Sequence, residues 1–209
     1  MTKTELYFIR HAESQANTQP HIIGGRSNHS PITEKGVEQA KRLGAHFLEK
    51  NIIPTKVFAS PAVRTLQTAK YTLETMGVDL ETTIDDDLQE IDQGDWVGRN
   101  RAEMYNQATL DEIKRLGKDF KALNGESMNE GGDRAFGWMD RAIDINEAIT
   151  DSERFFVFTH GLVTRCLASK VHDWSHAKTF EKSTDNTSYT LFVPREGKWQ
   201  LEYLGRKPE

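Results

Sequence analysis

The sequence predicts an α/β fold: a three-layer α/β/α sandwich with a mostly parallel central sheet and a helical or irregular lid insertion. Short apolar runs alternate with longer amphipathic stretches, which is the pattern of strands and helices in βαβ units. The chain has 209 residues, and a typical domain has roughly 150. We therefore expect a single domain over residues 1–209 that carries a lid insertion at about residues 85–133.

The first half of the chain predicts two strands and two helices. The strands are the apolar runs Leu6–Ile9 and Val57–Ala59. Thr33–Lys50 is a predicted helix with Thr33 as its N-cap. A second helix is predicted to start at Ser60-Pro61, because serine is a common N-cap and proline is favoured at the first helical position. Its apolar residues from Ala62 to Met76 recur every three or four positions and so share one face.

The second half is less regular until its last 80 residues. Residues 85–133 are weakly patterned, and a long irregular segment in a compact domain is often a lid. The predicted elements are one candidate helix within this segment (Ala102–Leu116), a helix at Asp133–Thr150, a strand at Phe155–Thr159, a helix at Gly161–Val171, and a hairpin of Tyr189–Val193 and Trp199–Leu204.

Composition and charge exclude several classes of protein. The longest apolar runs fall far short of the ~20 residues of a membrane span, so we expect no membrane partner. The run Leu6–Ile9 is too short for the core of a signal peptide. The one cysteine, Cys166, excludes an intramolecular disulfide and a cysteine-rich zinc site. A cytoplasmic protein is expected, and a net charge of −5 argues against nucleic acid as a partner.

Charged or polar motifs follow three of the predicted strands. They are Arg10-His11, Arg64 a few residues into its helix, and His160-Gly161. Open α/β sheets bind ligands at the carboxyl ends of their strands. Taken singly, each motif also fits an ordinary role: a surface histidine, an exposed arginine, and a hydrogen-bonded core histidine.

The combination of these motifs favours a binding pocket for an anion. Two arginines and two histidines at one edge of a sheet would be costly to bury without a compensating negative charge. A phosphoryl group supplies that charge and matches the fork geometry of arginine. The partner expected on this basis is a small phosphorylated metabolite.

A series of motifs in fixed order carries a resemblance to a known family. They are Leu6–Ser14 with Asn17, Thr33–Gly36 with Gln39-Ala40, Ser60-Pro61 with Arg64–Ala69, Leu88–Glu90 with Gly94–Trp96, Gly125–Ser127 and Thr159–Gly161. Together they resemble the signature of the histidine phosphatase superfamily, the phosphoglycerate mutase-like family. The resemblance covers most of the chain and is weakest over residues 100–124 and after Val171. The family usually has glycine at position 12, where this chain has Ala12.

The resemblance implies five catalytic residues. His11 would be the nucleophile that forms a phosphohistidine intermediate. Arg10, Arg64 and His160 would hold the phosphoryl oxygens and stabilise the charge of the transition state. Glu90 would protonate the leaving alcohol and then activate water.

The same resemblance implies the residues that bind substrate and the absence of a metal or cofactor. The substrate-binding residues would be Arg10, Ser14, Asn17, Gly24, Arg64, His160 and Gly161. Arg26 and His29, with the lid, are further candidates for the substrate end of the pocket. No metal and no cofactor are expected, because two arginines beside the histidines would repel a cation.

More than one activity is compatible with these motifs. Phosphoglycerate mutases typically carry Trp before the matching Asn and a Phe-Thr-Gly-Trp stretch, whereas this chain has Gln15-Ala16-Asn17 and then His21–Arg26. We therefore favour phosphomonoester hydrolysis over phosphoglycerate mutation. A metal-dependent hydrolase that uses His11, Glu13 and His160 stays open, and so does a non-catalytic phosphate-sensing module. Whether the chain forms a homodimer is also left open.

Overall fold

A mixed β-sheet forms the centre of the computed structural model, which describes residues 4–143, 153–181 and 183–209. Within these ranges the sheet has six strands in the order β3-β2-β4-β1-β5-β6. The strands are β1 (Thr4–Arg10), β2 (Lys56–Ala59), β3 (Thr82–Ile84), β4 (Glu153–Thr159), β5 (Tyr189–Arg195) and β6 (Lys198–Arg206). β3, β2, β4 and β1 are parallel, and β5 and β6 add antiparallel pairs at one end. The predicted α/β fold class is confirmed.

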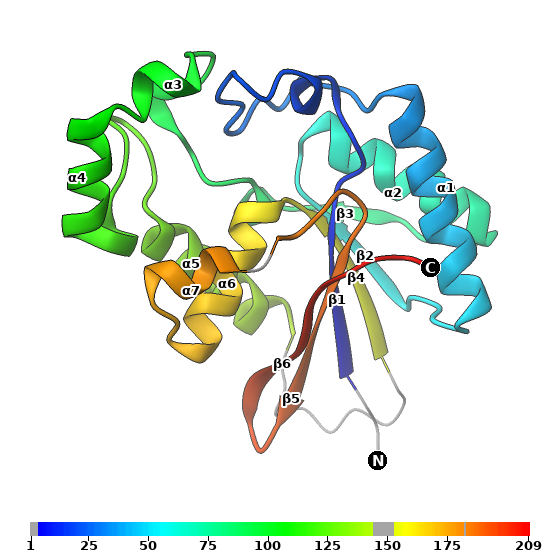
Figure 1. The fold of residues 1–209 in the computed structure, drawn as a ribbon. Coiled ribbons are helices and arrows are strands. Elements are labelled where there is room, and N and C mark those ends of the chain that lie inside the picture. The colour runs from blue at the N-terminus through cyan, green and yellow to red at the C-terminus, as the bar shows by residue number, and fades with distance from the viewer. Residues whose placement is uncertain (1–3, 144–152, 182) are drawn as a thin grey trace.

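Helices cover both faces of the sheet (Figure 1). On one face lie α1 (Glu34–Glu49) and α2 (Val63–Met76), and on the other lie α5 (Met128–Ala142) and α6 (Gly161–His172). The remaining helices are α3 (Arg101–Met104), α4 (Gln107–Leu116) and α7 (His176–Glu181), with 3₁₀ turns at Gln15–Thr18, Asp86–Leu88, Gly94–Trp96 and Gly117–Asp119. No helix in the described residues is both long and apolar enough to cross a membrane.

The central strands are buried on both sides. In β4, Phe155 and Val157 belong to the apolar cluster that includes Trp138 of α5. Phe156 and Phe158 belong to the opposite cluster, which includes Phe47 of α1. Because alternate side chains of a strand face opposite sides of the sheet, a strand covered on both faces is apolar throughout. This two-sided burial explains the uninterrupted apolar run that predicted β4.

The register of the parallel strands brings their following residues to one edge. Arg10 of β1 pairs with Thr159 of β4, and Ala59 of β2 pairs with Phe158. The residues after these three strands, His11, His160 and Ser60, therefore emerge side by side at the carboxyl edge.

The predicted start of α2 was wrong. The helix begins at Val63 with Ala62 as its N-cap, not at Ser60-Pro61. The Val63 amide donates to the Asn28 carbonyl (2.8 Å), and the Ser60 hydroxyl contacts the His160 ring instead of capping the helix. Ser60 therefore makes a tertiary contact with His160 and does not cap the helix as predicted.

The helix predicted at Asp133–Thr150 begins earlier, at Met128. A capping box starts it: the Ser127 hydroxyl accepts from the Glu130 amide (3.1 Å), and the Glu130 carboxylate accepts from the Ser127 amide (2.8 Å). The structure gives the helix as far as Ala142, and the part predicted over residues 144–150 lies outside the described residues.

The segment between β3 and α5 differs in detail from the single helix predicted at Ala102–Leu116. Two helices, α3 and α4, replace it, because the Asn106 side chain accepts from the Thr109 amide (3.1 Å) and starts a new helix. The sequence analysis also missed β3 and α7, which have three and six residues and offer too few positions for a periodic pattern.

Candidate active site

A cavity of about 590 Å³ lies at the carboxyl edge of the parallel strands and gathers most of the predicted site residues. Eight of them line it: Arg10, His11, Ser14, Asn17, Gly24, Arg64, Glu90 and Gly161. His160 lies against His11, with 5.3 Å between the ring centroids, but is fully buried and is not part of the lining.

His11 is held in one tautomer by its own neighbour. Its Nδ1 lies 2.7 Å from the Ala12 carbonyl oxygen. A carbonyl can only accept, so Nδ1 carries the ring proton and the lone pair lies on Nε2. Burial, then Arg64 and Arg10, lower the pKa of His11 well below its ordinary value. The ring is therefore neutral near pH 7, with an unprotonated Nε2 in a cationic cavity.

His160 is fixed through both ring nitrogens. The Arg64 Nη2 donates to His160 Nδ1 at 3.1 Å, since a guanidinium has donors only. The proton is then on Nε2, which donates to the Ser60 hydroxyl at 2.9 Å. Burial, followed by the positive charge of Arg64, lowers the pKa of His160 well below its ordinary value. His160 thus orients Arg64, and a direct contact between His160 and a phosphoryl oxygen stays a prediction.

The two arginines are anchored differently. Arg64 is 3 % exposed, and its Nη1 donates to the Ser27 carbonyl at 2.7 Å. Arg10 donates from Nη1 to the Thr184 carbonyl at 2.5 Å, while its Nε is buried without a hydrogen-bond partner among the described residues. Burial lowers the pKa of both guanidinium groups from the ordinary arginine value. An unpaired buried guanidinium N–H beside a cavity is a ready donor for an anion.

Glu90 sits at the N-terminus of α6. Its Oε1 accepts from the amides of Ile91 (2.9 Å) and Val163 (2.8 Å), and Oε2 accepts from that of Leu162 (3.1 Å). The three bonds fix the carboxyl group at the cavity wall. Oε2 has the fewer bonds and so keeps lone-pair capacity for a proton.

An ion pair supports the irregular segment that carries Glu90. Arg134 of α5 forms two parallel hydrogen bonds of 2.7 Å with Glu126, and its Nη1 donates to the carbonyls of Asp87 (2.6 Å) and Gln89 (3.1 Å). Arg26 donates from Nε to the Glu90 carbonyl at 3.1 Å. These contacts hold the backbone at and before Glu90 and so fix the position of Glu90 at the cavity wall.

The remaining predicted substrate residues fall into two groups. Asn17 Oδ1 accepts from the Ser14 amide (3.1 Å) and from Asn186 (3.2 Å), so its amide group is left to donate at the cavity wall. Gly24 also lines the cavity. Arg26 and His29 do not, because Arg26 turns to Glu90 and His29 is exposed. Their expected place at the substrate end of this cavity is therefore not observed.

Comparisons with known proteins identify the family to which the chain belongs. A family model described as the histidine phosphatase superfamily (branch 1) matches residues 6–207. The chain belongs to this superfamily. Among its relatives is a protein named probable phosphoglycerate mutase GpmB from Salmonella paratyphi A, 28% identical over 169 residues that make up 80% of this chain and 74% of that protein.

Solved structures share the superfamily fold. A mycobacterial glucosyl-3-phosphoglycerate phosphatase superposes with a TM-score of 0.82 at 19% identity, covering 98% of this chain and 100% of that one. The alpha-ribazole phosphatase of Shigella flexneri superposes with a TM-score of 0.77 at 21% identity, covering 96% of each chain.

Sequence reasoning missed four residues of this superfamily member that build the site: Ser60, Arg134, Thr184 and Asn186. The Asn186 amide bridges the His11 carbonyl (2.9 Å) and Asn17, and Thr184 supplies the carbonyl that holds Arg10. Ser60 belongs to a motif of the superfamily, but its predicted role as a helix cap was wrong. The others lie on segments that only the tertiary fold brings to the strand ends, and nothing in their local sequence separates them from surface polar residues.

Two buried neutral histidines should make the ligand-free histidine phosphatase fold less stable in acid. Folding lowers the pKa of His11 and His160, so below about pH 6.5 the unfolded chain binds protons first. The free energy of unfolding should be highest above pH 6.5 and then fall by up to about 1.4 kcal/mol per pH unit for each histidine. Urea denaturation at pH 7.5, 6.5 and 5.5 measures it.

The control for this effect is the double variant His11→Gln/His160→Gln. It keeps His46 and His176, whose pKa values burial also lowers, and should lose most of the slope. An unchanged slope in the double variant would assign the acid sensitivity to other groups.

Gly161→Ala should lower activity more than stability. A Cβ at this position would lie 3.2 Å from Arg10 Cδ and Nε and 2.9 Å from the Thr184 hydroxyl, so Arg10 must move. A displacement of about 1 Å in a side chain that binds phosphate can lower the rate about 100-fold. Alanine has a higher helix propensity than glycine, so the stability of α6 should not fall. We expect kcat/KM on an aryl phosphate to fall about 10- to 100-fold. Gly137→Ala in α5, with open space at its Cβ, is the matched control and should retain full activity.

Proposed function

We propose that this protein hydrolyses a phosphomonoester of a small metabolite through a phosphohistidine intermediate on His11. The observation that carries the proposal is the His11 ring, neutral and with Nε2 unprotonated, in one cavity with the guanidinium groups of Arg10 and Arg64. Such a ring is a nucleophile, and such a cavity attracts a phosphoryl dianion.

In the first step, His11 Nε2 attacks phosphorus and the bond from phosphorus to the ester oxygen breaks. Arg10 and Arg64 hold the non-bridging oxygens, where negative charge is greatest, and His160 keeps Arg64 in place. The leaving oxygen takes a proton from Glu90, which must bind that proton before the step. The product alcohol then leaves.

In the second step, water attacks the phosphohistidine and the N–P bond breaks. Glu90, now ionised, accepts the proton of the water. Inorganic phosphate leaves, and His11 returns to its neutral state with Nδ1–H still donating to the Ala12 carbonyl. No step requires a metal ion or a cofactor.

Hydrolysis of p-nitrophenyl phosphate should survive EDTA. The guanidinium groups of Arg10 and Arg64 beside His11 supply the positive charge that a metal would otherwise provide. The measurement is kcat/KM before and after dialysis against the chelator, and we expect less than a twofold change. Loss of activity that zinc or magnesium restores would favour a metal-dependent hydrolase.

Phosphoglycerate mutation is the second candidate, and the name of the Salmonella relative favours it. A mutase returns the phosphoryl group of His11 to a hydroxyl of the same substrate class instead of to water. Direct assay of the interconversion of 2- and 3-phosphoglycerate separates the two activities. Turnover faster than the hydrolysis of either compound would make the protein a mutase.

A further inference from the structure

A second, largely apolar chamber of about 390 Å³ adjoins the active-site cavity. Side chains from α4, α5, α6, α7 and the segment before α5 form its walls, and they include Leu110, Ile113, Phe120, Met128, Leu162 and Phe180. None of the α4 residues is buried, although that helix contributes Leu110 and Ile113 to the wall. The chamber is therefore an apolar space that the described residues do not fill.

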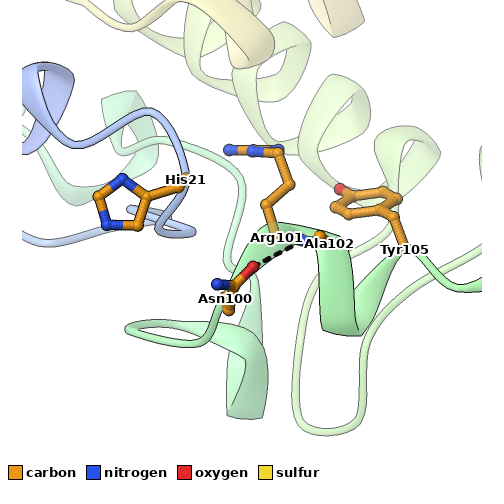
Figure 2. A pocket seen from close by; sticks show the side chains of 5 residues that line it. All are labelled: His21, Asn100, Arg101, Ala102 and Tyr105. Atoms are coloured by element: carbon orange, nitrogen blue, oxygen red, sulfur yellow. Dashed lines mark hydrogen bonds between the residues drawn. The ribbon is translucent and has the colours of Figure 1, made fainter.

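The chamber shares part of its wall with the active-site cavity. Six residues line both: Ile91, Gln93, Arg101, Tyr105, Leu162 and Phe180. Figure 2 shows two of these, Arg101 and Tyr105, with their side chains extending on the same side of the chain, while the Asn100 side chain turns back to accept from the Ala102 amide (2.9 Å). A ligand that extends from the cavity toward the chamber would pass along the six shared residues.

The contacts of Glu90 indicate which end of a substrate would enter the chamber. The amides of Ile91 and Leu162 both donate to the Glu90 carboxylate, and the side chains of the same two residues line the chamber. A group that protonates the leaving oxygen must lie beside it. The chamber thus lies on the leaving-group side of the phosphoryl site.

The charged residues of the chamber wall already have partners. Glu126 is paired with Arg134 at 2.7 Å, and Lys121 with Glu130 at 2.6 Å. The Arg101 guanidinium lies over the Tyr105 ring at 5.7 Å, and its Nε donates to the Pro20 carbonyl. Trp96 supports the aromatic wall by packing against Tyr105 and Phe120. The rest of the wall is mainly apolar, so an apolar ligand fits most of its surface.

We propose that this chamber binds the leaving group, and that the substrate is the phosphomonoester of an alcohol with an aliphatic or aromatic body. The inference rests on the proposed phosphohydrolase function and gives it a substrate class. Each methylene buried in an apolar site favours binding by about fourfold at most. A sugar in the same place would bury hydroxyl groups against a mostly apolar wall, which is costly wherever a hydroxyl finds no hydrogen-bond partner.

The test compares kcat/KM for ethyl, butyl and hexyl phosphate with that for glucose 6-phosphate. The three alkyl alcohols are leaving groups of nearly equal acidity, so the series isolates chain length. We expect a two- to fourfold rise per methylene, and hexyl phosphate should exceed glucose 6-phosphate at least tenfold. A flat series, or a preference for glucose 6-phosphate, would overturn the inference.

A matched pair of variants places the effect in the chamber. Leu110 lines it and is 45% exposed, whereas Leu123 lines neither cavity and is 72% exposed. Leu110→Gln should reduce the ratio of hexyl to ethyl kcat/KM at least threefold, and Leu123→Gln should retain the wild-type ratio. Equal ratios in the two variants would place the apolar preference elsewhere and refute the chamber.

Binding of alkylphosphonates separates this inference from the proposed function. They have no scissile ester bond, so calorimetry on the wild-type protein reports affinity without turnover. Hexylphosphonate should bind at least tenfold more tightly than methylphosphonate, and Leu110→Gln should reduce that ratio. If hexylphosphonate binds more tightly but no ester is hydrolysed, the proposed hydrolase function is refuted and the binding role of the chamber stands. If esters are hydrolysed but the two phosphonates bind with equal affinity, only the binding role of the chamber is refuted.

Discussion

His11→Ala is expected to reduce the hydrolysis of p-nitrophenyl phosphate roughly 10⁴-fold or more. The ring supplies the nucleophile of the first step, and its Nε2 is unprotonated because Nδ1 donates to the Ala12 carbonyl at 2.7 Å. His160 cannot substitute, since Arg64 and Ser60 engage both of its ring nitrogens. Steady-state kcat measures the loss.

Rapid quenching of the wild-type protein during turnover should also trap a phosphoprotein that is labile in acid and stable in base. His11→Ala should form none. His172→Ala, at the exposed end of α6, is the matched control and should keep both activity and phosphoprotein. Hydrolysis by His11→Ala at the wild-type rate would exclude covalent catalysis at this residue, and the absence of catalysis in both proteins would favour a phosphate-sensing module.

Arg64→Lys is expected to lower kcat/KM about 100- to 1,000-fold, although the positive charge is kept. Arg64 donates to the Ser27 carbonyl and to His160 Nδ1 through separate nitrogens of one planar group. A lysine ammonium is a point donor on a flexible stem, so it cannot hold both partners and also present a fork to phosphoryl oxygens. The pH profile should change too, because His160 loses the donor that keeps its Nδ1 unprotonated.

Two measurements separate this effect from unfolding. Thermal denaturation should show a folded protein, and the inhibition constant for orthophosphate should rise together with the loss of kcat/KM. Arg42→Lys on the exposed face of α1 is the control and should match the wild type in both. An Arg64→Lys protein with normal kinetics would show that charge alone, without the geometry of the guanidinium, serves the site.

The order of strands and helices could be predicted because burial gives a strand or helix a recognisable pattern of apolar residues. The apolar strand before His160 and the periodic helix after Thr33 both show it, and the structure confirms them as β4 and α1. Short elements show no such pattern, which is why β3 and α7 were missed. The start of α2 was mispredicted for a different reason: local capping preference competes with tertiary contacts, and at Ser60 the contact with His160 prevailed.

The motifs were sufficient to group five residues in one ordered set and to indicate the superfamily. They are Arg10, His11, Arg64, Glu90 and His160. What each of these side chains contacts could be learned from the fold alone. His160 contacts Arg64 and Ser60, and Arg10 Nε has no hydrogen-bond partner among the described residues. Glu90 accepts from amides of α6 beside an apolar chamber. The physical reason is that periodicity and motifs report on neighbours along the chain, whereas these contacts join segments up to about 100 residues apart that the sheet register alone brings together.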